Sequence, residues 1–312
     1  MMASESVLEI SGLSKTYGAG KMQTLALNRL DLSVHRGEIF GYLGPNGAGK
    51  TTTIRLLLDL IRPSSGSARI FGLDTRADSV EIHRRIGFLP GELSLWEGRT
   101  GDQIIHYVAS VRGDTRGIAK QAGELAEQLD LDTSKRVRDL SSGNKRKLGL
   151  VIAMMHSPAL LILDEPTGGL DPLVQQTFHE MMDDYRAKGR TVFLSSHVLS
   201  EVQAICDRVG ILRDGELKAV ESVEKITNVE FHWVDVTFRD TLPAGLQQQL
   251  ESLPSITNIS TNGARVRMRM AGDFDPLLRA ISSGYVETLH VEEPSLEEIF
   301  LAFYSGDEET TI

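Results

Sequence analysis

The sequence predicts an α/β protein with a small α+β domain at its carboxyl end, and three observations support this. Short apolar runs alternate with helical patterns up to about residue 225, as in a parallel sheet covered by helices. Residues from about 98 to 157 are mostly helical in pattern, so a helical lobe should be inserted within the first domain, residues 1–225. Beyond residue 226 the pattern changes to short strands and helices, which predicts a second domain over residues 226–312.

Composition limits the functions open to the chain. Its 312 residues, 41% hydrophobic and 24% charged, are ordinary for a globular protein. The formal charge of −10 argues against a nucleic-acid-binding surface, and the single cysteine, Cys206, excludes an internal disulfide framework and fits a reducing compartment. The first residues show no signal-peptide pattern, and no apolar run reaches the ~18 residues of a membrane span. Any membrane role is therefore expected to come through a partner.

Hydrophobic periodicity predicts the elements of the first domain. Residues 7–10 and 30–34 alternate apolar and polar side chains, which indicates half-buried strands. Asp214-Gly215 predicts a hairpin turn, and a helix is expected over 51–60, with Pro63 after its end. More continuous apolar runs predict further strands at 38–43, 86–89, 160–163, 191–194 and 209–212.

The second domain has the predicted element order βαββαβ, with a helix after it. Asn262-Gly263 predicts a type I′ hairpin, and the Arg residues that follow it alternate with apolar residues, so one face of that strand should be packed. Ser295 begins a capping box that should open the last helix. The predicted fold is a small ferredoxin-like module, whose strands and helices are expected at 231–238, 246–253, 256–270, 276–281 and 286–291.

A glycine-rich segment joins the strand predicted at 38–43 to the following helix. It reads Gly44, Pro45, Asn46, Gly47, Ala48, Gly49, Lys50, Thr51 and Thr52, the pattern of a phosphate-binding P-loop. Glycines let backbone N–H groups approach a triphosphate, and the helix presents its positive amino end. Lys50 is expected to neutralise the β and γ phosphates of the triphosphate, and the Thr51 hydroxyl to bind Mg²⁺. An ordinary glycine-rich loop is the alternative, which the flanking strand and helix disfavour.

Two adjacent carboxylates, Asp164 and Glu165, follow the strand predicted at 160–163. This strand should deliver Asp164 close to the P-loop, where Mg²⁺ is usually held by one or two carboxylates, a hydroxyl and phosphate oxygens. Glu165 is then placed to orient or deprotonate the attacking water. An acidic pair that only caps a strand is the alternative, and the P-loop upstream disfavours it.

With these motifs in place, residues from about 7 to 225 resemble the ATP-binding subunit of ABC transporters. Leu140 and the four residues after it are similar to that family's LSGGQ signature, with Ser142 in place of Gly and Asn144 in place of Gln. The resemblance implies that Ser141 and the Gly143 N–H contact the γ-phosphate of ATP held by a second copy of the subunit, with Ser142 and Asn144 in the same nucleotide-binding segment. Small residues that open a helix also form an anion-binding end. The alternative is a Ser-Gly cap on a surface helix.

Other segments match the family at corresponding positions. Residues 168–171 resemble the D-loop, which implies that Asp171 lies at the dimer interface near the nucleotide. Ser195-Ser-His197 follows an apolar strand, and His197 resembles the switch histidine that donates to the γ-phosphate. Tyr17 matches the aromatic that stacks on adenine.

One departure concerns the Q-loop glutamine, which normally contacts Mg²⁺ and senses the membrane partner. Gly91 and Glu92 stand at this place, so Glu92 is the expected replacement. This Leu-Pro-Gly-Glu variant and the carboxyl-terminal residues 291–300 resemble the ATPases of ABC-2-type exporters. The resemblance implies export of a drug, antibiotic or lipid-like substrate through a separate membrane permease, with the subunit peripheral at the cytoplasmic face of the membrane.

Two alternatives come from other functional classes. A soluble ABC-type ATPase that acts on ribosomes or DNA is one, although the chain has one P-loop, no sustained heptads and a negative charge. A nucleotide-binding regulator that never hydrolyses ATP is the other, against which the intact Asp164–Glu165 pair and His197 argue.

Overall fold

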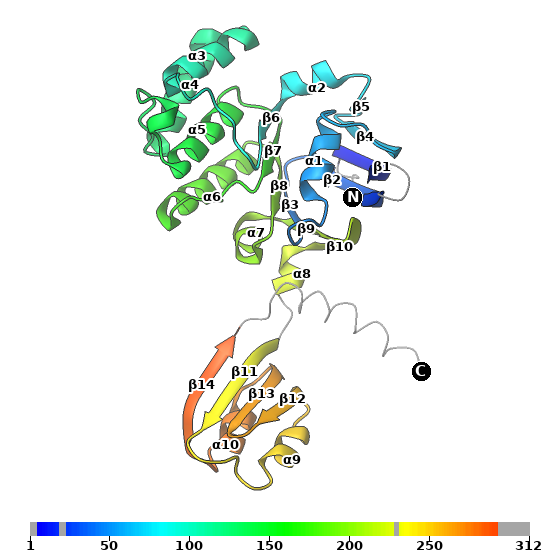
Figure 1. Cartoon of the computed structure of the whole chain (residues 1–312), viewed down its shortest axis with the longest axis vertical. Coiled ribbons are helices and arrows are strands. Elements are labelled where there is room, and N and C mark those ends of the chain that lie inside the picture. The colour runs from blue at the N-terminus through cyan, green and yellow to red at the C-terminus, as the bar shows by residue number, and fades with distance from the viewer. Residues whose placement is uncertain (1–4, 19–22, 228–230, 293–312) are drawn as a thin grey trace. The chain divides into compact units, whose positions relative to one another are not determined.

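The structure is a computed structural model that describes residues 5–18, 23–227 and 231–292. The chain divides into two compact units, Met1–Val223 and Glu224–Ile312, shown in Figure 1.

A six-stranded sheet forms the centre of the first unit, with the strand order β10-β9-β3-β8-β7-β6. All neighbours pair in parallel except β10, which is antiparallel to β9. The carboxyl ends of β3, β7 and β8 therefore meet at one edge of the sheet, where ligands bind in folds of this kind. The strands are β3 (Ile39–Leu43), β6 (Ile86–Leu89), β7 (Leu160–Asp164), β8 (Thr191–Ser196), β9 (Arg208–Arg213) and β10 (Glu216–Ser222).

A separate antiparallel sheet, with the order β2-β1-β4-β5, packs on this core. The strands predicted at 7–10 and 30–34 belong to it and are longer than expected. Strands β4 and β5 were not expected, because Ser65–Ile70 has three exposed residues at its start and little apolar alternation. The four strands are β1 (Ser6–Tyr17), β2 (Thr24–His35), β4 (Ser65–Ile70) and β5 (Leu73–Asp74).

Helices cover both faces of the central sheet. In Figure 1, α1 and the antiparallel sheet lie on one side, and α5 and α6 lie on the other. Helix α1 ends at Leu57 rather than Leu60, because Asp59 adopts a left-handed conformation with φ 54° that terminates the turn. The helices of this unit are α1 (Lys50–Leu57), α2 (Ser79–Arg85), α3 (Gly101–Arg112), α4 (Thr115–Gln128), α5 (Ser142–Met154), α6 (Pro172–Ala187) and α7 (Leu199–Ile205), with a 3₁₀ turn η2 (Val137–Asp139). The short helix α8 (Val223–Thr227) begins at the last residue of this unit.

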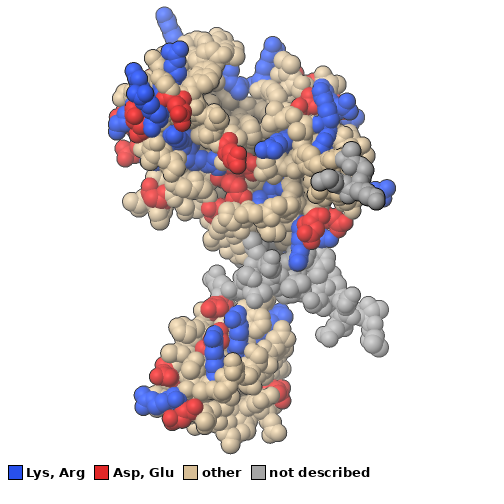
Figure 2. Space-filling model, in the orientation of Figure 1, with Lys and Arg blue, Asp and Glu red and all other residues tan. Residues whose placement is uncertain are grey.

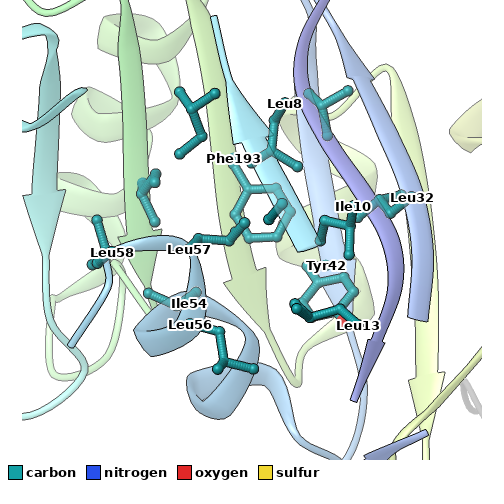
Figure 3. Packing of buried hydrophobic residues seen from close by; sticks show 14 of the residues in the cluster. Leu8, Ile10, Leu13, Leu32, Tyr42, Ile54, Leu56, Leu57, Leu58 and Phe193 are labelled. Carbon is teal, nitrogen blue, oxygen red and sulfur yellow. The ribbon is translucent and has the colours of Figure 1, made fainter. Parts of the chain in front are cut away.

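The core of the first unit lies between the two sheets and α1 (Figure 3). Apolar side chains alternate inward from the strands, and α1 with its C-cap residue contributes a continuous apolar stripe because Ile54, Leu57 and Leu58 recur at helical spacing. Cys206 is also buried, at 7% exposure, and burial raises the pKa of its thiol, with Asp207 adding to the shift and Arg186 opposing it. The labelled core residues are Leu8, Ile10, Leu13, Leu32, Tyr42, Ile54, Leu56, Leu57, Leu58 and Phe193.

The second unit contains a four-stranded antiparallel sheet with the order β12-β13-β11-β14, which is the ferredoxin-like arrangement of the predicted βαββαβ order. Val266, Met268 and Met270 of β13 point into its core. The last helix expected from Ser295 lies outside the described residues. The elements are β11 (Phe231–Phe238), α9 (Leu246–Glu251), β12 (Ile256–Asn262), β13 (Arg265–Ala271), α10 (Asp275–Ile281) and β14 (Val286–Glu292).

The hairpin between β12 and β13 differs from the prediction in its turn. Asn262 pairs with Arg265, so the two central residues are Gly263 and Ala264. Gly263 alone of these two has a positive φ, 62°, as in a type II′ turn rather than the expected type I′. A one-residue shift would move Val266 and its alternating neighbours out of the core, so packing decides the register.

Candidate active site

The loop between β3 and α1 forms a cradle. Gly44 must be glycine, because a Cβ there would lie 2.3 Å from the Leu212 carbonyl oxygen. Gly49 caps α1 with φ 111°, which is accessible to glycine. A cavity of about 350 Å³ lies over this loop and is lined by Ala26, Pro45, Asn46, Gly47, Gly49, Lys50, Thr51, Thr52, Glu165, Gly168 and His197.

Lys50 fixes the loop and supplies positive charge to the cavity. Its side chain is 6% exposed, and Nζ donates to the Gly44 carbonyl at 2.6 Å and to the Pro45 carbonyl at 3.3 Å. Nζ also lies 3.3 Å from Oε1 of Glu165. The ammonium is therefore held at the cavity wall, where it can neutralise an anionic ligand.

Asp164 at the end of β7 has both carboxylate oxygens occupied. Oδ2 accepts from the Thr51 hydroxyl at 3.0 Å, and Oδ1 accepts from the Ser195 hydroxyl at 2.5 Å. Asp164 is 2% exposed, so these bonds offset the desolvation of its charge. A hydroxyl and a carboxylate side by side are the hard oxygen donors that Mg²⁺ prefers.

Glu165 occupies a constrained position next to Asp164. Its φ is 52°, a left-handed conformation that costs an L residue about 1–2 kcal/mol. Its carboxylate lies between two cationic or polar groups, with His197 Nδ1 2.6 Å from Oε2 and Lys50 on the other oxygen. His197 is half exposed and follows β8, so neighbouring strands of the sheet bring these groups together.

Sequence reasoning missed three contributors to the site. Ala26 comes from β2, in the other sheet, and lines the cavity. Ser195 is fully buried and donates to Asp164, whereas the sequence pattern marks it only as part of the segment that leads to His197. Arg146 is buried although it sits in a Lys-Arg-Lys run that looks solvated. Burial lowers the pKa of Arg146, against the opposing effect of Asp164 and Glu165.

The signature residues do not line the cavity of their own chain. Ser141 caps α5, where its hydroxyl accepts from the Asn144 N–H at 3.2 Å. Asp171 caps α6 in the same way, accepting from the Val174 N–H at 3.0 Å. Gly143 packs tightly against the 168–171 loop, since a Cβ on it would lie 3.0 Å from the Gly169 carbonyl oxygen. The signature segment and the 168–171 loop therefore pack against each other. Ser142 and Gly143 lie in the first turn of α5.

Tyr17 and Glu92 lie outside the cavity lining. Tyr17 ends β1 at 39% exposure, and the Lys15 ammonium lies 5.0 Å from its ring centroid. Glu92 is exposed in the loop after β6. The preceding residue, Gly91, lies against Asp164, because a Cβ there would be 3.1 Å from Oδ2. The loop that carries Glu92 therefore touches the carboxylate expected to bind Mg²⁺.

Comparison with known proteins identifies the family. Residues 27–168 match the ABC transporter family profile. The bacitracin transport ATP-binding protein BcrA of Enterococcus faecalis is 36% identical over 236 residues, 74% of this chain and 73% of BcrA. The chain belongs to the ABC transporter ATP-binding family. The linearmycin resistance ATP-binding protein LnrL of Bacillus subtilis is 28% identical over 309 residues, 95% of this chain and 97% of LnrL.

Solved structures agree with this ABC assignment. A structure described as the ATP-binding subunit of an ABC transporter has a TM-score of 0.65 and 32% identity, covering 71% of this chain and 92% of that one. The predicted α/β fold of ABC ATPase type and the predicted family are confirmed. As a member of this family the chain is a nucleotide-binding ATPase subunit of a transporter, so the reading as a regulator that never hydrolyses is not favoured.

Two further observations on the ABC subunit concern membrane-spanning helices and the distribution of surface charge. Within residues 5–18, 23–227 and 231–292, no helix is long and apolar enough to cross a membrane. On the face seen in Figure 2, Lys and Arg side chains are interspersed with Asp and Glu rather than gathered into one basic surface. The alternative of an ATPase acting on ribosomes or DNA is not favoured.

Proposed function

We propose that this subunit hydrolyses MgATP at the cavity over the P-loop to power export through a separate membrane permease. The observation that carries the proposal is the position of Glu165, whose carboxylate lies between Lys50 and His197 at the wall of the cavity. A carboxylate beside the phosphate-binding loop can both orient a water molecule and accept its proton. The relatives' names support export, since BcrA is a bacitracin transport protein and LnrL a linearmycin resistance protein.

Each group has a defined part in hydrolysis. The P-loop N–H groups and Lys50 bind the β and γ phosphates, Glu165 orients and deprotonates the attacking water, and His197 holds the Glu165 carboxylate and donates to the γ-phosphate. Mg²⁺ fits between Thr51 and Asp164, and within the described residues no three His, Cys, Asp or Glu side chains form a complete metal site of their own. When bound, Mg²⁺ neutralises the charge that develops on the phosphate oxygens. Glu92 is the proposed additional ligand from the neighbouring loop.

The complete site requires a second copy of the chain. Residues 141–144 sit at the amino end of α5, outside the cavity of their own chain, and their small side chains suit an anion. We assign them, with Asp171, to the ATP held by the partner copy, in a head-to-tail dimer that encloses two ATP molecules. Tyr17 is the proposed adenine contact. The carboxyl-terminal domain predicted over residues 226–312 has a proposed role in dimer contact or restraint of the ATPase.

A Glu165→Gln variant tests this proposal. Turnover should fall about 10²–10⁴-fold, while ATP binding persists, because the amide keeps the shape but cannot accept the proton. ATP should then hold the variant as a dimer, visible by size-exclusion chromatography with light scattering. Glu97→Gln, on an exposed loop residue, is the matched control. A wild-type rate in Glu165→Gln would remove Glu165 from the catalytic role.

The permease has a candidate docking surface on the helical lobe. Trp96 and Tyr107 are each 53% exposed, and their rings pack edge to face at 4.9 Å. They line a hollow with Arg99, Gln103 and His106, and Trp96 lies in the same loop as Glu92. Exposed aromatic pairs of this kind mark protein interfaces. The subunit is thereby proposed to be peripheral at the cytoplasmic face of the membrane.

Co-purification of a polytopic membrane protein with the tagged subunit tests the proposal that a permease is its partner. A Trp96→Ser, Tyr107→Ser double variant should lose that protein while its basal ATPase rate stays unchanged. Retention of the membrane protein by the double variant would place the interface elsewhere. Recovery of ribosomes instead would favour the alternative function, an ABC-type ATPase that acts on ribosomes. The identity of the membrane protein then directs the choice of antibiotic, drug or lipid-like substrates for transport assays.

A further inference from the structure

Arg146 in the second turn of α5 is the most extensively bonded side chain near the site. Arg146 is 6% exposed, and its guanidinium donates to main-chain carbonyls of two separate segments, the loop after β6 and the end of β7. The five acceptors are the carbonyl oxygens of Pro90 at 2.7 Å, Gly91 at 3.0 Å, Asp164 at 2.7 Å and Pro166 at 3.2 Å, together with that of Glu165.

The bond to the Glu165 carbonyl matters because of the backbone conformation there. Glu165 has φ 52°, which an L side chain adopts only where its surroundings hold it. Its N–H is held by Ser195, whose carbonyl and hydroxyl accept at 3.1 and 3.2 Å. Its carbonyl is held by Arg146 and by the Gly168 N–H at 3.3 Å. Arg146 is thus the charged donor among the groups whose hydrogen bonds hold the Glu165 backbone.

Only an arginine can make this set of contacts. The planar fork of the guanidinium donates in several fixed directions at once, whereas a lysine ammonium is a single point. The next residue, Lys147, illustrates the difference. It is buried to a similar degree, at 8% exposure, yet within the described residues its Nζ makes one hydrogen bond, to the Asp130 carbonyl at 3.4 Å.

We propose that Arg146 is a positioning residue for ATP hydrolysis, which holds the Glu165 backbone in its left-handed conformation and ties it to Gly91. The inference rests on the proposed catalytic role of Glu165. Its consequence is a direct mechanical connection. A displacement of the loop that carries Gly91 and Glu92, or of α5 with its signature residues, reaches the Glu165 carboxylate through one side chain.

Three variants test the proposal in the full-length chain. Arg146→Ala removes the fork and Arg146→Lys keeps only the charge, so both should lower kcat by about 10²-fold through a small displacement of Glu165. KM for ATP should change little, because the P-loop is intact. Arg112→Ala is the matched control, since Arg112 also joins the helical lobe to carbonyls near β6, those of Arg84 and Ile86, away from the site.

Chemical rescue separates positioning from simple loss of structure. Guanidinium ions, well below denaturing concentrations, should restore part of kcat to Arg146→Ala by occupying the vacated carbonyl cluster. Sodium at the same ionic strength should not, and guanidinium should not raise the rate of wild type or Arg112→Ala. If Arg146→Ala fails to fold, the kcat and KM of Arg146→Lys decide the matter.

The outcomes distinguish this inference from the proposed function. A wild-type kcat in Arg146→Lys, or a loss expressed only in KM, overturns the role of Arg146. If guanidinium rescues nothing in a folded Arg146→Ala, positioning is likewise refuted. An inactive Glu165→Gln beside a wild-type Arg146→Lys leaves the proposed function standing, whereas a fully active Glu165→Gln removes the proposed role of Glu165 whatever Arg146 does.

Discussion

His197 Nδ1 lies 2.6 Å from Oε2 of Glu165, so the imidazole orients the carboxylate from the side opposite Lys50. This distance allows a strong hydrogen bond with Nδ1–H as the donor. The second ring nitrogen, Nε2, is not needed for this bond, and His197 lines the cavity. One imidazole can therefore hold the proposed base and contact the phosphate.

Replacement of His197 should affect turnover more than binding. We expect His197→Ala to lower kcat by about 10²-fold, because Glu165 loses the group that fixes its rotamer, while ATP affinity falls much less. Steady-state ATPase kinetics and nucleotide titration check this. His106→Ala, an exposed histidine of the helical lobe, should keep the wild-type rate. A His197→Ala variant with normal kcat would show that Glu165 needs no orienting partner.

Ser195 should contribute to both stability and metal affinity. Ser195→Ala removes the hydroxyl that donates to Asp164 Oδ1 and accepts from the Glu165 N–H. We therefore expect a loss of about 1–3 kcal/mol in the free energy of unfolding. The Mg²⁺ concentration for half-maximal ATPase activity should rise. Ser196→Ala removes a neighbouring buried hydroxyl that bonds Glu201. It should destabilise the chain without changing the Mg²⁺ requirement, and equal Mg²⁺ curves for both variants would contradict the prediction.

Two substitutions at Ser141 separate its capping role from nucleotide contact. Ser141→Ala removes the cap on α5 and should cost about 1 kcal/mol of stability. Ser141→Asp keeps a capping oxygen but adds negative charge where the partner's γ-phosphate is expected. It should unfold like wild type yet fail to dimerise with ATP. Thermal unfolding measures the effect on stability, and light scattering measures dimer formation. ATP-dependent dimers of Ser141→Asp would place the phosphate contact elsewhere.

Glu92 offers a test of the departure from the family glutamine. If its carboxylate takes part in binding Mg²⁺ beside Asp164, Glu92→Gln should raise the Mg²⁺ concentration needed for half-maximal activity, because an amide is a weaker ligand for a hard cation. Glu97→Gln lies on the same exposed loop and should leave the Mg²⁺ curve unchanged. An identical curve for Glu92→Gln would remove Glu92 from the metal site.

His156 should make stability sensitive to mild acid. Burial lowers its pKa to about 4, with Arg112 adding to the effect, while a bond to the Ile86 carbonyl opposes it. The unfolded chain takes up this proton near pH 6.5 and the folded chain only near 4. The contribution of neutral His156 to the free energy of unfolding is therefore complete above pH 6.5 and is lost as pH falls toward 4. The loss is at most about 1.4 kcal/mol per pH unit, and it is smaller because the side chain is partly exposed.

Denaturant unfolding across this pH range measures the effect. His156→Gln keeps a donor for the Ile86 carbonyl but does not titrate, so its stability should fall less steeply between pH 6.5 and 4. The same slope in wild type and variant would assign the acid sensitivity to other groups.

Local motifs were predictable from sequence, and long-range contacts were not. The P-loop, Asp164 and Glu165 could be placed because each lies at the end of an apolar strand, and parallel pairing brings such ends together. Arg146 could not be assigned, because its acceptors are main-chain carbonyls up to 56 residues away, which carry no side-chain signature. The turn at Gly263 shows the same limit, since core packing rather than the Asn-Gly pair set its register.

The burial of Cys206 has a practical consequence for following this transporter subunit at work. The thiol is enclosed and its pKa is raised, so alkylating probes should leave the folded wild-type chain unlabelled. A Leu173→Cys variant, at a position 78% exposed on α6 beside Asp171, would then carry a single reactive handle. Spin or fluorescent labels placed there could time the approach of two copies during each ATP cycle, without first removing the native cysteine.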